Sequence, residues 1–230
     1  MALTFAGASS ESASVSSGGT ISAVPLTLAC WVNPATVSGA DAMVELDDGT
    51  DTNDVFLLYL ATGVINAFTS AAGVSSTATA GTAIGTGAWS HAAGVFASAT
   101  SRVAYKNGVA GTEETTSRIP TTIDSVRLGS QVGTNFMDGT LAEVGIWNVA
   151  LDAGEIAALA KGFSPQLIRP ASLIHYYPLI RGTVNQGGSS NTTLDFGKAG
   201  LNLTETNTPT YSDPHVRLYY PLGPLSGEFV

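Results

Sequence analysis

Cysteine is nearly missing from this sequence. Cys30 is the only cysteine among 230 residues, so no disulfide bond can form within the chain. It shares one face of an alternating segment with Leu26, Leu28 and Val32, which predicts an inert thiol in the core. No basic residue lies nearby in the sequence to lower the pKa of this thiol, so the pattern does not favour a reactive cysteine.

Positive charge is also scarce. No lysine or arginine precedes Arg102, whereas residues 1–101 contain seven acidic side chains. The formal net charge of the whole chain is −9 at pH 7. A surface with this charge repels phosphate backbones, so we expect no binding to nucleic acid. The charge is typical of a soluble acidic face, and alternatively of a patch that meets a cation or a basic partner.

Long apolar runs are missing as well. Residues 1–5 include no basic residue and begin no long apolar core, so we expect no signal peptide. No run approaches the ~18 apolar residues that span a bilayer, and we expect no membrane partner. Hydrophobic residues still make up 44% of the chain and charged residues only 12%, which is typical of a globular protein.

Short apolar segments alternate with turn clusters between Leu3 and Trp147, which predicts an all-β protein. Residues 26–32 predict one strand with two distinct faces. Residues 55–60 are denser in apolar side chains, as in a strand covered on both faces. Asn107-Gly108 is the sequence of a two-residue hairpin turn. The chain therefore has the pattern of a sandwich.

The segment from Thr140 to Trp147 predicts one further strand, and its alternation assigns the residues to two faces. Ala142, Val144 and Ile146 are expected on one face, and Leu141, Glu143 and Trp147 on the other.

A short helix is predicted directly after this strand. Asp152 is a good N-cap, and Glu155 stands three residues later, at the spacing of a capping box. Leu151 and Ile156 are placed to form a hydrophobic staple across that cap. Gly162 then ends the pattern, so we expect a helix near residues 152–161.

Four motifs in this order resemble the laminin-G-like and pentraxin-like domains, which share a concanavalin A-like jelly roll. The motifs lie at residues 3–7, 26–34, 89–95 and 103–108, and the strand and helix of residues 136–162 follow them. The resemblance covers residues 1–165 and implies a two-sheet antiparallel jelly-roll sandwich with one short helix near 152–161. This family includes lectins, adhesion modules, hydrolases and virion proteins, so the resemblance does not decide the function.

Residues 166–230 form a C-terminal extension in this interpretation. Segments 174–182 and 194–204 resemble the beginning of many laminin-G-like domains, although here they follow the helix. Two arrangements are therefore open. Either the domain is permuted and the extension pairs with its own sandwich, or the extension completes a neighbouring copy.

The tetrapeptide Tyr-Tyr-Pro-Leu occurs twice in this extension, at residues 176–179 and 219–222. Proline within an apolar segment suits an edge strand or an arm that lies on a surface. We expect the second copy to pack as an arm, either on its own domain or on a neighbouring subunit. The residues of this predicted intersubunit arm are Leu218, Tyr219, Tyr220, Pro221 and Leu222.

Acidic residues gather between Asp41 and Asp54. Glu45 and Asp47 match two of the three carboxylates of jelly-roll glucanases, but no third glutamate follows, so we expect no catalytic residues. The same oxygen atoms suit calcium, which stays an alternative to the absence of any cofactor. The pentraxin-like resemblance implies acidic calcium ligands just before Phe136, where this sequence has none.

Tryptophan faces stack on sugar rings, and Trp31, Trp89 and Trp147 all lie in predicted strands. For Trp147 we expect a place in the core beside the helix. A glycan site would use Trp31 and Trp89 together with Asp47 and Asp51 of the acidic loop, and the alternative for both tryptophans is the core.

Two functional hypotheses follow. The family fold is mostly found outside cells, yet the chain lacks an export signal and a disulfide, which fits a non-enzymatic protein made in the host cytoplasm and placed on the virion surface. We expect a phage capsid decoration or fibre-type protein whose partners are capsid proteins and its own copies, as a homo-oligomer such as a trimer. The alternative is a lectin-like module that binds host-surface glycans, with or without calcium.

Overall fold

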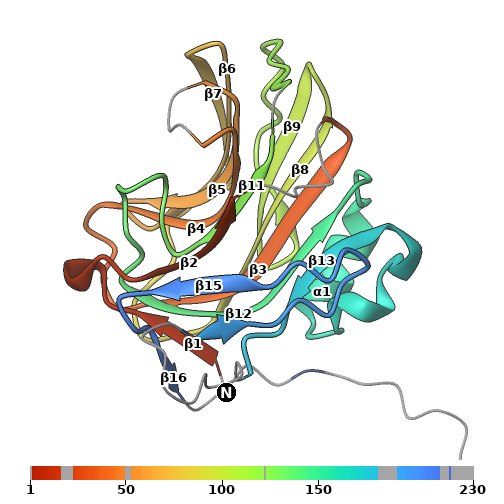
Figure 1. The fold of residues 1–230 in the computed structure, drawn as a ribbon. Coiled ribbons are helices and arrows are strands. Elements are labelled where there is room, and N and C mark those ends of the chain that lie inside the picture. Colours follow the sequence, from red (N-terminus) through yellow and green to blue (C-terminus); the bar gives the residue numbers. More distant parts are fainter. Residues whose placement is uncertain are drawn as a thin grey trace, which may run out of the picture.

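The computed structural model describes residues 2–16, 23–49, 53–121, 123–180, 191–212 and 218. In this part of the chain, two antiparallel sheets of eight strands each face one another, and helix α1 (Ala153–Ala160) lies outside one of them (Figure 1). The predicted all-β jelly-roll sandwich with one short helix is therefore confirmed.

Sheet A carries the helix on its outer face. Its strand order is β10 (Val109–Ala110), β9 (Ser101–Lys106), β8 (Ser90–Ser98), β3 (Leu26–Pro34), β12 (Gly139–Trp147), β1 (Ala2–Phe5) and β16 (Thr210–Ser212), and β13 (Leu173–Tyr177) also pairs with β12. The turn at Asn107-Gly108 joins β9 to β10, and both residues have the positive φ that this hairpin needs.

Sheet B is the opposite layer of the sandwich. Its order is β14 (Thr192–Thr193), β15 (Leu203–Thr206), β2 (Ser12–Ser16), β11 (Ser125–Leu128), β4 (Ala40–Asp47), β5 (Val55–Ala61), β6 (Val64–Ala71) and β7 (Val74–Thr79). Short 3-10 helices occupy Gly7–Ser9, Pro165–Leu167 and Pro170–Ser172.

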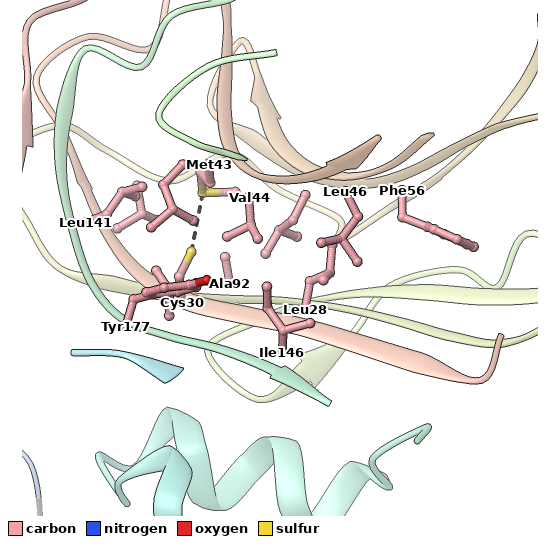
Figure 2. Close-up of a cluster of buried hydrophobic side chains, with 14 of the residues drawn as sticks. Leu28, Cys30, Met43, Val44, Leu46, Phe56, Ala92, Leu141, Ile146 and Tyr177 are labelled. Carbon is pink, nitrogen blue, oxygen red and sulfur yellow. Dashed lines mark hydrogen bonds between the residues drawn. The ribbon is translucent and has the colours of Figure 1, made fainter. Parts of the chain in front are cut away.

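The main core fills the space between the sheets (Figure 2). Cys30 lies in it with no exposed surface, and its Sγ is 3.9 Å from Sδ of Met43. Burial raises the pKa of this thiol well above its ordinary value, so the predicted inert core cysteine is confirmed. Strand β5 is also covered on both faces, because Phe56 points into the main core and Leu57 into a cluster on the outer face of sheet B.

A bulge in β12 changes the predicted alternation of that strand. Its pairing with β3 shifts between Ala142 and Gly145, and Glu143 adopts a φ of +54°. The extra residue moves Leu141 into the main core together with Val144, although the sequence pattern placed them on opposite faces. The expected strand is present, but the placement of Leu141 on the face opposite Val144 and Ile146 is wrong.

The helix begins as its sequence predicts. The Glu155 N–H donates to Asp152 Oδ1 at 2.9 Å, and the Asp152 N–H donates back to Glu155 Oε2 at 2.8 Å. Leu151 and Ile156 pack in a second buried cluster between α1 and sheet A. Trp147 is fully buried in this cluster and donates its indole N–H to the Ile168 carbonyl, which confirms its core position.

The described residues of the extension pair within the same chain. Strand β13 pairs with β12, β15 pairs with β2, and β16 pairs with β1. Both sheets therefore include strands from residues 173–212. Leu218 is half-buried, whereas Tyr219, Tyr220, Pro221 and Leu222 lie outside the described residues, and the intersubunit role of the arm stays a prediction.

Asp195 holds this extension against the sandwich. Its buried carboxylate accepts hydrogen bonds at 2.8 Å from the backbone N–H groups of Tyr176, Gly197 and Leu201. The same carboxylate lies 2.8 Å from Nδ1 of the buried His175. One side chain therefore satisfies backbone groups from strand β13 and from the loop that runs beside it.

We predict that Asp195→Ala lowers the free energy of unfolding by about 3–5 kcal/mol, because it leaves His175 and several N–H groups buried without their acceptor. Urea denaturation followed by tryptophan fluorescence measures this loss. The control is Thr204→Ala, an exposed position in the same extension, which should change stability by less than ~0.5 kcal/mol. Equal midpoints for wild type and Asp195→Ala would contradict the prediction.

Candidate functional site

A groove with a volume of about 460 Å³ lies at one end of sheet A. This size is within the ~300–1,000 Å³ that is usual for small-molecule sites. The ends of β1 and β3, the start of β12 and a loop before β8 form its walls. The lining residues are Thr4, Phe5, Ala6, Asn33, Pro34, Ala35, Thr86, Gly87, Asp138, Gly139 and Thr140.

Three polar side chains cross the groove on neighbouring strands. The register pairs Thr140 with both Thr4 and Asn33, and because the adjacent residues Leu3, Val32 and Leu141 point into the core, these three lie on the outer face. The hydroxyl oxygens of Thr4 and Thr140 are 3.0 Å apart. Oδ1 of Asn33 is buried and has no hydrogen-bond partner among the described residues. An unpaired buried amide oxygen is unusual in a folded protein, and this one belongs to a residue that lines the groove.

Glycine allows the strands to meet closely at the floor of this groove. Gly139 has a φ of +150°, and a Cβ atom there would lie 2.6 Å from the Asn33 carbonyl oxygen. The Ala35 N–H donates to the Asp138 carbonyl at 2.8 Å, and the Gly87 N–H donates to the Pro34 carbonyl at 3.1 Å. These bonds fix the position of both loops that border the groove.

The pairing of β3 with β8 places Trp31 and Trp89 near the groove, although neither is among its described lining residues. Trp31 stands two residues before Asn33, on the same outer face of β3. Strand β8 begins at Ser90, one residue after the predicted strand position of Trp89. Because Ser90 pairs with Val32, the register extended by one residue places Trp89 opposite Asn33. Both tryptophans are half-buried, so each keeps some accessible surface.

His91 supports Trp31 from the neighbouring strand. The two residues are direct register partners, and their rings meet edge to face with centroids 5.4 Å apart. His91 is buried, and burial lowers its pKa to about 3. Its backbone N–H donates to Oδ1 of Asn107 at 2.7 Å. The imidazole is therefore neutral at physiological pH and acts as a packing surface for Trp31.

Asp47 lies on the other sheet, so the structure does not bring it to the two tryptophans. It is fully buried on the outer face of sheet B, where Oδ2 accepts from Nε of Arg127 at 2.8 Å and Oδ1 from the Gly49 N–H at 2.6 Å. The alternation along β4 and β11 places both side chains on that face. Asp51, the other acidic residue of the predicted glycan site, lies outside the described residues.

The carboxylate of Glu45 is also enclosed. It has no exposed surface, and its Oε2 accepts from the Val132 N–H at 3.2 Å. Neither Glu45 nor Asp47 therefore presents a carboxylate to solvent. Among the described residues, no three His, Cys, Asp or Glu side chains gather as candidate metal ligands.

No helix in the described ranges is long and apolar enough to cross a bilayer.

Sequence reasoning did not identify Asn33, Thr140 or Asp138 as site residues. Asn, Asp and Thr at strand ends are ordinary turn residues, so their types carry no specific signal. Only the pairing of β3 with β12 and β1 brings them to one groove.

The family model described as the concanavalin A-like lectin/glucanases superfamily matches residues 7–157 of this chain. A comparison with curated proteins gives no match.

Solved structures also resemble this chain. A heptameric SAP-like pentraxin from Limulus polyphemus is 17% identical with a TM-score of 0.56, and the match covers 69% of this chain and 81% of that one. A candidate carbohydrate-binding protein from Bacteroides ovatus is 17% identical with a TM-score of 0.64, over 91% of this chain and 58% of that one. The CBM40 module of a Ruminococcus gnavus sialidase, bound to α2,3-sialyllactose, is 15% identical with a TM-score of 0.53, over 61% and 83%. These matches show a shared fold.

We predict that His91→Gln flattens the acid dependence of stability. The His91 pKa is about 3 in the folded chain and about 6.5 in the unfolded chain. As the pH falls from 6.5 toward 3, only the unfolded state takes up this proton, so wild type loses up to ~1.4 kcal/mol per pH unit from this residue. Urea denaturation at pH 7, 6, 5 and 4 should show the wild-type advantage over the variant shrinking. Parallel curves would contradict the assignment.

Proposed function

Because the chain belongs to the concanavalin A-like lectin/glucanase superfamily, we propose that it is a non-enzymatic carbohydrate-binding protein whose sugar site is the groove at the end of sheet A. The observation that carries the proposal is a polar groove wall, formed by Thr4, Asn33 and Thr140, near two half-buried tryptophans: Trp31 on β3 and Trp89 just before β8.

This combination matches the chemistry of a sugar. A pyranose ring has apolar C–H faces, which pack on an indole, and hydroxyl groups at its edge, which need hydrogen-bond partners. Trp31 and Trp89 offer the first kind of surface, and the threonine hydroxyls and the Asn33 amide offer the second. A few placed polar groups within a largely apolar groove are also the usual composition of a small-ligand site.

The structural neighbours support binding over turnover. The Ruminococcus gnavus module holds a sugar, and the Bacteroides ovatus protein is described as a candidate carbohydrate binder. In this chain, the two carboxylates that resemble part of a glucanase motif, Glu45 and Asp47, are enclosed by protein hydrogen bonds. General acid and base catalysis at a glycosidic bond needs carboxylates that reach the substrate.

Assembly of several copies would strengthen such a site, since linked weak sites bind with higher avidity. The pentraxin neighbour is heptameric, and we propose a homo-oligomer for this chain also. The virion surface location, the capsid partners and the trimer expected from the sequence stay predictions, because neither the fold nor the comparisons bear on them.

We predict that Trp31→Ala weakens sugar binding about tenfold or more, which corresponds to ~1.4 kcal/mol, because it removes the stacking surface. A glycan array identifies a bound sugar, and isothermal titration then measures its Kd for each variant. The matched control is Phe196→Ala, which removes an aromatic side chain that is 50% exposed away from the groove and should leave the Kd unchanged. Repeating the array with a chelator tests the calcium alternative.

A second variant separates loss of binding from loss of folding. Asn33→Ala removes a groove-lining amide whose Oδ1 has no partner among the described residues, so it should weaken binding while the denaturation midpoint stays near that of wild type. Sugar binding that survives both Trp31→Ala and Asn33→Ala would overturn the groove as the site.

A further inference from the structure

We propose that the groove selects neutral sugars and rejects acidic ones that carry a carboxylate or sulfate. This inference rests on the proposed function and specifies the ligand class of the same site. Its basis is the charge and the hydrogen-bonding polarity of the residues in and behind the groove wall.

The charge around the groove is negative. Asp138 is the one ionisable residue among the described residues that line it. Directly behind, Oδ1 of the buried Asp41 accepts from the Asp138 N–H at 3.3 Å. On the β1 side, Oε2 of Glu11 accepts from the N–H of Ala6, another lining residue, at 2.7 Å. Three carboxylates therefore lie in the groove or one hydrogen bond away from it.

The pKa of Asp41 is consistent with negative charge at the groove. Burial raises the pKa of its carboxyl; the hydrogen bond from the Asp138 N–H lowers it in part, and the nearby negative charge of Asp138 raises it. A second anion brought into the groove would meet the same repulsion.

Described basic side chains do not offset this charge at the groove. Arg127 pairs with Asp47 on sheet B, and Arg169 pairs with Glu155 beside the helix. Lys106 donates to the carbonyl of Thr82 at 2.9 Å, in the loop that continues to Thr86, but it does not line the groove. An acidic sugar entering this groove would therefore find no cationic partner among the described lining residues.

Hydrogen-bonding polarity leads to the same ligand class. The Asp138 carboxylate is the charged group of the groove and only accepts hydrogen bonds, so the ligand group next to it has to donate. A neutral sugar presents many O–H donors that can complete these bonds. A sugar carboxylate or sulfate presents acceptors only, so it would place acceptor against acceptor as well as charge against like charge.

The test is a glycan array printed with neutral oligosaccharides and with the same oligosaccharides capped by sialic acid or sulfate. At 20 mM NaCl we expect the acidic version of each bound sugar to bind at least about tenfold more weakly, and at 500 mM NaCl this ratio should shrink because salt screens exposed charges. Asp138→Asn keeps the side-chain shape and should reduce the ratio at low salt. Asp124→Asn makes the same change of charge at an exposed position next to β11 of sheet B and should leave it unchanged.

Equal or preferred binding of the acidic sugars by wild type would overturn the selectivity while leaving carbohydrate binding in place. An unchanged ratio in Asp138→Asn would overturn the assignment of selectivity to this groove. Failure to bind any sugar on the array, by protein that unfolds at its normal midpoint, would instead overturn the proposed function and this inference with it.

Discussion

The hydrogen bonds of the buried Asp195 carboxylate are the interaction on which the complete sandwich depends. It joins β13 to the loop at residues 196–201 through backbone hydrogen bonds, and that loop leads into β15 and β16. Strand β13 in turn supplies Leu173 and Tyr176 to the cluster beneath the helix. Strand β12, which carries one wall of the groove, pairs with β13 and β1 along the same edge. Asp195 thus anchors β13, which pairs with the strand that forms one wall of the groove.

Local patterns were sufficient to predict much of the fold. Alternation of apolar residues identified the core face of β3, and the capping box at Asp152 identified the helix start. The bulge at Glu143 was not predictable in this way, because a glutamate gives no sign of a positive φ. The pairing of residues 173–212 was left open as well, because sequence alternation does not say which strand is the partner.

In the candidate site, too, the residue types could be read from the sequence, whereas the strand register that positions them could not. Trp31 and Trp89 were identified by residue type, but their positions near the groove depend on the pairing of β3 with β8. Asp47 belongs to a different layer because β4 pairs with β11, where Arg127 neutralises it from 80 positions away in the sequence. Long-range partners of this kind determine whether an acidic residue is a ligand or a buried structural group, and composition alone does not reveal them.

The position of strand β1 determines which end of the domain is suited for attachment to another structure. It lies between β12 and β16, and Ala2 pairs with Ser212, so two points at opposite ends of the sequence adjoin in space (Figure 1). The groove is reached at the other end of this strand, at Thr4 to Ala6, roughly 10 Å further along at ~3.3 Å per residue. If the domain is attached to another protein through a segment next to Ala2 or Ser212, the attachment lies at one end of β1. The groove at the other end of this strand then faces away from the point of attachment.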